Sequence, residues 1–127
     1  MALHVLVVDD SAVMRAMLVR TLRLSGLPLG TVHEAGNGVD ALAILAAHPV
    51  DLALVDINMP VMNGEQLINH VRANPRLAGL VIVVVSTEGS ETRIEALKAR
   101  GVAFVHKPFT AEQLRATVLQ VLGVADA

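Results

Sequence analysis

Three aspartates, a serine and a lysine in this sequence have the side chains and the positions needed to handle a phosphoryl group. Asp9 and Asp10 stand at the end of one apolar run, and Asp56 stands at the end of another. Ser86 and Lys107 each end a further apolar run. Adjacent carboxylates at the end of a buried strand lose hydration and repel each other, so a pair kept there favours a bound cation.

The chemistry that suits these side chains is metal-assisted phosphoryl transfer. Aspartates that cluster without histidine or cysteine form a site of hard oxygen ligands, for which Mg²⁺ is the natural ion. Aspartate can also act as a nucleophile and form an acyl phosphate, and Asp56 is the candidate for this role. The metal and Lys107 would neutralise charge on the transferring group, and the Ser86 hydroxyl would donate a hydrogen bond to it.

The apolar runs that carry these residues alternate with longer amphipathic segments. The runs predict strands at 4–8, 31–35, 52–55, 81–85 and 104–106. The amphipathic segments predict helices at 11–25, 38–48, 64–74, 91–100 and 110–122. Regular alternation with continuously apolar strands predicts an α/β fold, in which helices cover both faces of a five-stranded parallel sheet.

This fold would bring the polar residues together, because ligands of open parallel sheets bind beyond the carboxyl ends of the strands. Ser11 and Thr110 are expected to cap the helices that follow them. In the helix at 11–25, Met14 and Met17 lie on two neighbouring lines of apolar side chains and are expected to belong to the core.

The composition suits one packed domain. Of 127 residues, 54% are hydrophobic and 17% are charged. The absence of cysteine excludes disulfides, thiolate zinc sites and cysteine nucleophiles. A formal charge of −2 and an aromatic content of 2% give no support for nucleic-acid binding. No apolar stretch is long enough to span a membrane and no signal peptide is recognisable, so we expect a cytoplasmic protein without membrane contact.

Five short motifs occur in order along the chain: "VLVVDDS", "EAGNGVDAL", "LVDINMPVMNG", "VVVST" and "VHKPF". Together they cover essentially the whole chain, and in this order the sequence resembles the receiver domains of response regulators, most closely the single-domain chemotaxis type. The resemblance implies a flavodoxin-like (βα)5 fold with strand order 2-1-3-4-5. It also implies a single receiver domain over residues 1–127 with no output domain.

The resemblance assigns a role to each acidic residue at the strand ends. Asp56 resembles the phosphoacceptor, and Asp10 resembles a direct ligand of Mg²⁺. Asp9 resembles the acid that holds the metal through water. The backbone carbonyl of Asn58 is the third implied protein ligand, beside Asp10 and Asp56.

Further roles follow for the last two motifs. Lys107 resembles the lysine that contacts the phosphoryl group, and Pro108 the proline that follows it after a cis peptide bond. Ser86 resembles the switch hydroxyl, and Phe104 the aromatic residue that reorients with it.

Hydrolysis of the acyl phosphate is implied to be tuned by Asn58, Thr87 and Glu88. Thr87 departs from the family pattern, because a smaller residue is usual there, and its side chain could restrict access to Asp56.

These roles imply a stand-alone two-component response regulator. It would take a phosphoryl group from a phosphohistidine of a sensor kinase or a histidine phosphotransfer protein, and it would catalyse its own phosphorylation and dephosphorylation without turning over a separate substrate. The target protein is expected to bind the face formed by residues 91–100, 104–106 and 110–122, while Met14 and Arg15 help to dock the kinase. A monomer is expected, with dimerisation on phosphorylation left open.

Other functions remain to be tested against this one. Chemotaxis signalling is expected, but a phosphorelay intermediate or a phosphate sink would use the same site. The segment "GNGVDA" at 36–41 fits a dinucleotide-binding loop between a strand and a helix. A phosphatase with an aspartyl nucleophile is a further alternative, although its usual second aspartate is Asn58 here. Asp9 and Asp10 alone could also form an ordinary helix-capping turn.

Overall fold

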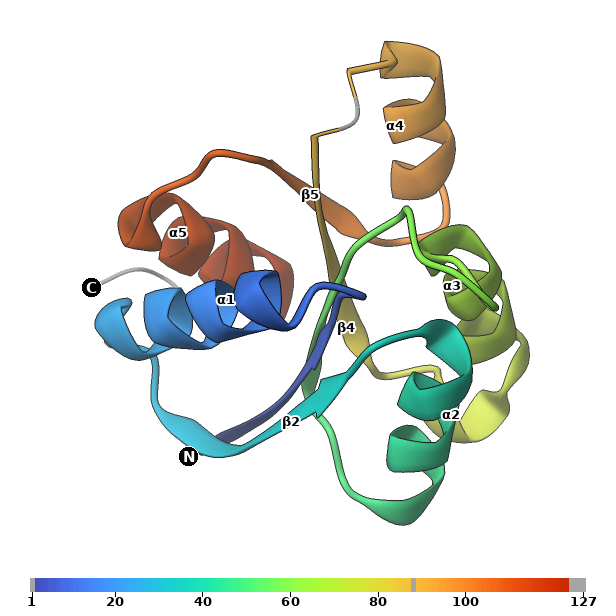
Figure 1. The fold of residues 1–127 in the computed structure, drawn as a ribbon, viewed down its shortest axis with the longest axis horizontal. Helices are drawn as coiled ribbons and strands as arrows, with labels where there is room; N and C mark the ends of the chain where they lie inside the picture. The colour runs from blue at the N-terminus through green and yellow to red at the C-terminus, as the bar shows by residue number, and fades with distance from the viewer. Residues whose placement is uncertain (1, 88, 124–127) are drawn as a thin grey trace.

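The computed structural model describes residues 2–87 and 89–123, which form alternating strands and helices (Figure 1). The strands are β1 (Leu3–Val8), β2 (Leu29–Ala35), β3 (Leu52–Val55), β4 (Val81–Ser86) and β5 (Ala103–His106). The helices are α1 (Ala12–Leu24), α2 (Gly38–Ala47), α3 (Gly64–Ala73), α4 (Glu91–Lys98) and α5 (Ala111–Leu122), with a short 3₁₀ helix, η1 (Pro75–Leu77), after α3.

The strands form one parallel sheet in the order β2-β1-β3-β4-β5. This confirms the predicted fold class and strand order. Parallel strands need crossover connections, and α1, α2, α3 and α4 each supply one between successive strands, which is why the apolar runs and amphipathic segments alternate in the sequence.

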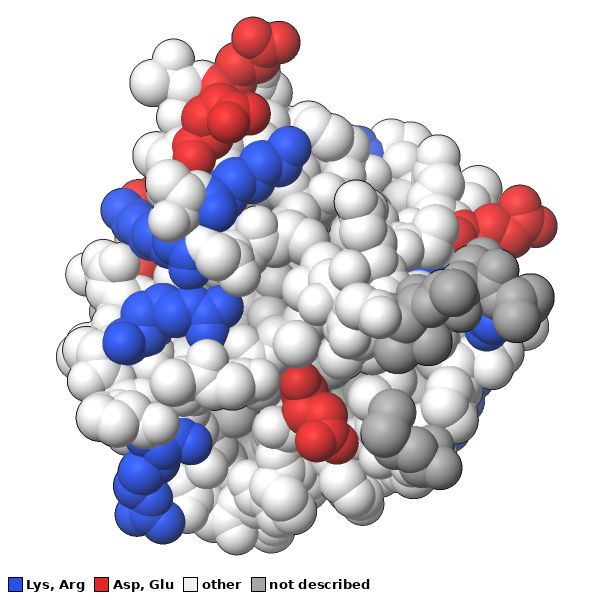
Figure 2. Space-filling view, turned by 180° about the vertical axis from the view of Figure 1, so that it is seen from behind, with Lys and Arg blue, Asp and Glu red and all other residues white. Residues whose placement is uncertain are grey.

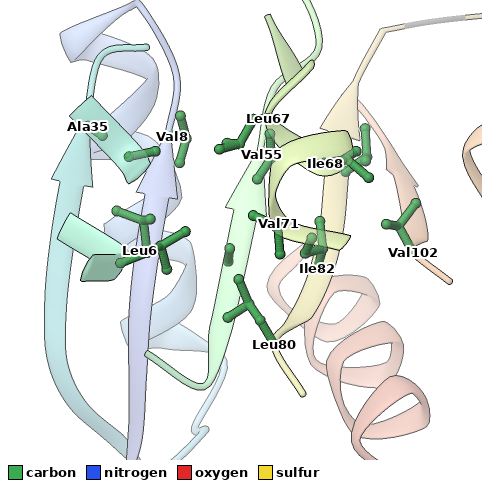
Figure 3. Close-up of a cluster of buried hydrophobic side chains, with 14 of the residues drawn as sticks. Leu6, Val8, Ala35, Val55, Leu67, Ile68, Val71, Leu80, Ile82 and Val102 are labelled. Carbon is green, nitrogen blue, oxygen red and sulfur yellow. The ribbon is translucent and has the colours of Figure 1, made fainter. Parts of the chain in front are cut away.

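Helices cover the sheet on both faces. Helices α1 and α5 lie side by side on one face, and α2, α3 and α4 lie on the other (Figure 1). Successive residues of a strand point to opposite faces, so Val5 and Val7 of β1 pack under α1 and α5, whereas Leu6 and Val8 pack under α2 and α3. Figure 3 shows the second of these clusters, in which Leu67 and Ile68 of α3 lie over the sheet.

Helix α1 corrects one expectation about the core. Leu18 and Leu22 are buried, but Met17 is 56% exposed and Val13 is 71% exposed. The sequence pattern predicts two neighbouring lines of apolar side chains along this helix. A helix lying on a sheet buries a single stripe, and here the stripe runs through Leu18 and Leu22. Met14 lies at its edge and is partly buried.

The helix starts are fixed by side-chain caps. The Ser11 side chain accepts a hydrogen bond from the backbone N–H of Met14 at 3.2 Å, which confirms it as the cap of α1. Thr110 and Gln113 form a reciprocal capping box at the start of α5. Among the described residues, no helix is both long and apolar enough to cross a bilayer.

Candidate functional site

Backbone hydrogen bonds continue past the strand ends and carry the polar residues to one edge of the sheet. The N–H of Asp9 donates to the carbonyl oxygen of Ala35 at 3.1 Å, and the N–H of Asp56 donates to that of Val8 at 2.9 Å. The N–H of Lys107 donates to the carbonyl oxygen of Ser86 at 2.9 Å. The predicted site residues therefore lie side by side because their strands do.

Three carboxylates converge at this edge. Asp9, Asp10 and Asp56 each offer one oxygen, and these oxygens all lie within 4.8 Å of one another. Asp9 is only 2% exposed, the Asp56 side chain is 13% exposed, and Asp10 is open to solvent. Hard oxygen donors at this separation, open to water on one side, fit Mg²⁺, which keeps several waters when it is bound by one or two carboxylates.

Lys107 supplies positive charge next to this cluster. Its Nζ donates to Asp9 Oδ2 at 3.3 Å and lies 4.0 Å from Asp56 Oδ1. Its side chain is 16% exposed, so solvent screens these contacts only in part. One ammonium faces three carboxylates, which leaves excess negative charge for a divalent cation to balance.

The two adjacent aspartates are held differently. Asp9 Oδ1 accepts a hydrogen bond from the Ser11 N–H at 2.9 Å, and its other oxygen accepts from Lys107. Asp9 therefore accepts a hydrogen bond within the turn before α1 and also belongs to the cluster of three carboxylates. The structure gives exposed Asp10 no comparable bond among the described residues, so its carboxylate remains available to a ligand.

Burial raises the pKa of the Asp56 carboxyl above its ordinary value. The charges of Asp9 and Asp10 raise this pKa further. The Lys107 ammonium opposes them, and so does the Ile57 N–H, which donates to Asp56 Oδ1 at 2.9 Å. A cation bound between the three carboxylates would favour the ionised form of Asp56, which is the nucleophilic form.

The predicted switch residues lie on β4 and β5. Ser86 is 1% exposed at the end of β4, paired in register with His106. Phe104 lies opposite Val84, is partly buried against the core under α2, α3 and α4, and has its ring centroid 4.7 Å from that of His106.

The remaining predicted residues lie in the loops that follow β3, β4 and β5. Asn58 and Thr87 are both exposed. Asn58 lies two residues after Asp56, and Thr87 lies one residue after Ser86. The peptide bond between Lys107 and Pro108 is cis. Glu88, predicted to tune hydrolysis, lies outside the described residues.

Two residues have roles at the site that sequence reasoning missed. Arg15, expected to help dock a kinase, donates to the backbone oxygen of Asp9 at 2.6 Å and to Glu34 Oε1 at 3.2 Å, so it braces the acidic turn. Gly64 lets α3 approach the site, because a Cβ atom there would collide with the carbonyl oxygen of Asp56. The signal for Gly64 was its place as the first residue after the capping Asn63.

The structure speaks against dinucleotide binding at residues 36–41. Such a loop needs open space for a pyrophosphate at the helix N-terminus, close to the glycines. Here Gly38 donates its N–H to Met62 O at 3.1 Å, and a Cβ atom on Gly38 would meet the Met62 side chain at 2.6 Å. The preceding strand, β2, is also at the edge of the sheet, where the first strand of that fold would be internal.

An apolar groove lies beside Lys107 and along α1. It has a volume of about 300 Å³ and is lined on one side by Met14, Met17 and Leu18. Its other side is lined by Thr87, Lys107, Pro108 and Phe109. The groove therefore joins the exposed apolar line of α1 to the lysine beside Asp56.

Comparison with known proteins agrees with this fold. The response regulator receiver domain family matches residues 5–119. The chain is 40% identical to chemotaxis protein CheY1 of Helicobacter pylori strain J99 over 126 residues, which cover 98% of this chain and 100% of the relative. It is 35% identical to chemotaxis protein CheY of Pseudomonas aeruginosa over 120 residues, covering 94% and 95% of the two chains. The solved structure of chemotaxis response regulator CheY4 of Vibrio cholerae superposes with a TM-score of 0.82 at 34% identity, covering 95% of this chain and 99% of that one. The chain therefore belongs to the response regulator receiver domain family, and its relatives include CheY-type chemotaxis regulators.

Proposed function

We propose that the protein is a response regulator that accepts a phosphoryl group from a phosphohistidine onto Asp56 in the presence of Mg²⁺. The observation that carries this proposal is the set of three carboxylate oxygens within 4.8 Å, with the Lys107 ammonium in contact with two of the three side chains. A structural helix cap would need one of these acids and would gain nothing from the other two.

In the transfer step a carboxylate oxygen of Asp56 forms a bond to phosphorus while the bond from phosphorus to the donor imidazole nitrogen breaks. The second ring nitrogen of the donor carries a proton, so the imidazole keeps the electron pair of the broken bond and leaves as a neutral ring, and the product is an acyl phosphate. Lys107 would hold a phosphoryl oxygen, and the distance of 4.0 Å between its Nζ and Asp56 Oδ1 supports this role. Asp10, Asp56 and the Asn58 carbonyl would hold Mg²⁺, with Asp9 acting through water. The ion would neutralise and orient the phosphoryl oxygens.

The acyl phosphate would change the protein through Ser86 and Phe104. A phosphoryl group adds negative charge and acceptor oxygens next to Asp56, which favour approach of the Ser86 hydroxyl and the Lys107 ammonium. Movement of Ser86 at the end of β4 would alter the space beside Phe104 on β5. The output surface is then the face of α4, β5 and α5, where a target protein would bind.

The donor is proposed to dock on the groove beside α1. Met14 and Met17 line this groove next to Lys107, and a helix of a sensor kinase or histidine phosphotransfer protein could cover it while its histidine points at Asp56. Thr87 forms part of this opening, and with Asn58 and Glu88 it is proposed to limit attack of water on the acyl phosphate. The protein would act as a monomer before phosphorylation.

The test is phosphorylation with acetyl phosphate. The purified protein is incubated with acetyl phosphate and MgCl₂, and intact mass is measured with and without EDTA. We expect a gain of one phosphoryl group that needs Mg²⁺ and is absent in Asp56→Asn. The exposed Asp40→Asn is the matched control and should be phosphorylated like the wild type. No gain, or an equal gain in Asp56→Asn, would refute the proposal.

A further inference from the structure

A second cavity lies at the edge of the sheet opposite the aspartates. It has a volume of about 750 Å³, within the range of sites that hold small organic molecules. Leu42 and Leu45 of α2 line one wall, and Leu77 of η1 lines another. Val50, which lies just before β3 begins, also lines it. The cavity thus lies between the C-terminal ends of α2 and α3, and its lining combines these apolar side chains with a nearly equal share of polar surface.

The rim of this cavity carries one arginine and two histidines beside one acid, Asp51. Arg76, His48 and His70 all line it. The structure gives the exposed Arg76 guanidinium no acceptor among the described residues, whereas Asp51, the acid on the rim, already accepts from the His4 N–H at 2.9 Å. The His48 ring is held in place by stacking on His33, with centroids 4.6 Å apart.

The wider charge distribution also favours an anion on this side. Figure 2 shows Lys and Arg side chains gathered along the edge of the molecule where α3 and α4 lie. The last turns of these helices and η1 contribute Arg72, Arg76 and Lys98. The carbonyl ends of α2 and α3 would repel an anion, so its charged group must lie toward Arg76 and away from those ends.

The two helices that border the cavity also border the phosphorylation site. At its N-terminus α3 donates the Gly64 N–H to Ile57 O at 2.9 Å, and α2 donates the Gly38 N–H to Met62 O at 3.1 Å. Both contacts hold the loop of residues 57–63 that follows Asp56. A ligand bound between the C-terminal ends of α2 and α3 would therefore contact two helices whose N-terminal ends are hydrogen-bonded to this loop.

We infer that this cavity binds a small organic anion with an apolar body. The body lies against Leu42, Leu45 and Leu77, the anionic group lies beside Arg76, and occupancy changes the environment of residues 57–63. This inference stands apart from the proposed function, because binding and its effect on the loop can be measured without phosphorylation.

The probe is anilinonaphthalene sulfonate, which joins an apolar body to one negative charge. Isotope-labelled protein is titrated with it and followed by methyl and amide NMR. We expect saturable shifts at Leu42, Leu45 and Leu77, and smaller ones at Gly64. Arg76→Gln should weaken binding roughly tenfold, the value expected for losing a hydrogen bond to a charged group. The matched control is Arg20→Gln, at an exposed position of α1, which should leave the affinity for the sulfonate unchanged.

A second probe separates charge from apolar contact. Phenylnaphthylamine lacks the sulfonate, so it should bind more weakly than the sulfonate to the wild type and equally to wild type and Arg76→Gln. Shifts confined to Met14, Met17 and Phe109, equal affinity of Arg76→Gln for the sulfonate, or no saturable binding would each overturn the site. Shifts in the cavity without any change between residues 57 and 64 would overturn the coupling to the loop.

Discussion

Neutralising Asp10 is expected to stabilise the protein without a divalent cation and to destabilise it with one. Without a cation, three carboxylates within 4.8 Å repel one another, and Lys107 balances only one charge. At about this distance one pair costs roughly 1–3 kcal/mol for an effective dielectric constant between about 80 and 20. Asp10 is exposed, so the lower end applies, and Asp10→Asn should raise the free energy of unfolding by about 1 kcal/mol.

With Mg²⁺ the sign should reverse. A ligand present at about one hundred times its dissociation constant stabilises the folded state by about 2.7 kcal/mol. Asp10→Asn removes a charged ligand and its attraction for the ion, so the variant should gain much less than the wild type at the same Mg²⁺ concentration. The loss of this stabilisation exceeds the repulsion relieved, and Asp10→Asn becomes the less stable protein.

The measurement is urea unfolding followed by circular dichroism, since the chain contains neither tryptophan nor tyrosine. Wild type, Asp10→Asn and Asp9→Asn are compared in EDTA and in MgCl₂. Asp9→Asn should be destabilised in both, because Asp9 is 2% exposed and accepts bonds from Ser11 and Lys107. Asp40→Asn is the surface control. If Asp10→Asn is destabilised equally in EDTA and in MgCl₂, the carboxylates do not form a repelling, cation-binding cluster.

Three further predictions use the same unfolding assay without Mg²⁺. Burial raises the pKa of Asp56, so its ionised form opposes folding. The Asp56→Asn variant should therefore be as stable as the wild type below the pKa of an unfolded aspartate, and more stable than the wild type once the pH has risen through the pKa of Asp56 in the folded protein. A stability difference that stays constant across pH would contradict this. Val61 is 82% exposed and has φ at +67°, so Val61→Gly should raise the free energy of unfolding by about 0.5–1 kcal/mol. The control variant Val39→Gly in α2 should lower it. A loss of stability at both positions would contradict strain at Val61. Gly64→Ala should cost about 1–3 kcal/mol, since its Cβ meets the Asp56 carbonyl oxygen, and a neutral effect would show that α3 can retreat from the site.

The ends of the strands could be predicted well because they depend on local patterns. Continuous apolar runs that end in polar residues marked Asp9, Asp56 and Lys107, and parallel order then required those ends to meet. The strand order itself came from resemblance, since periodicity does not say which strands are neighbours. The distinction between buried Asp9 and exposed Asp10 depends on the Ser11 and Lys107 contacts, which only the folded chain contains.

Side-chain partners distant in sequence could not be predicted. Arg15 of α1 donates a hydrogen bond to Glu34 of β2. Met17 is exposed because a neighbouring line of side chains on α1, and not the line of Met17, packs on the sheet. The cavity at the opposite edge joins His48, His70 and Arg76 from three separate elements, and no spacing rule links them. Such features depend on how helices pack on the sheet, and the hydrophobic pattern of each helix alone leaves that rotation undetermined.

The hydrogen bonds that continue past the strand ends have a consequence for how this chain tolerates insertions. Because side chains alternate along a strand, one extra residue within β3 would shift Asp56 by about 3.3 Å and turn it to the other face of the sheet. The same insertion in the connections at the opposite edge, such as residues 48–51, could be absorbed by the loop without moving a carboxylate. Natural variation in length should therefore accumulate at the edge that holds the second cavity, and the edge that holds the aspartates should keep its residue count.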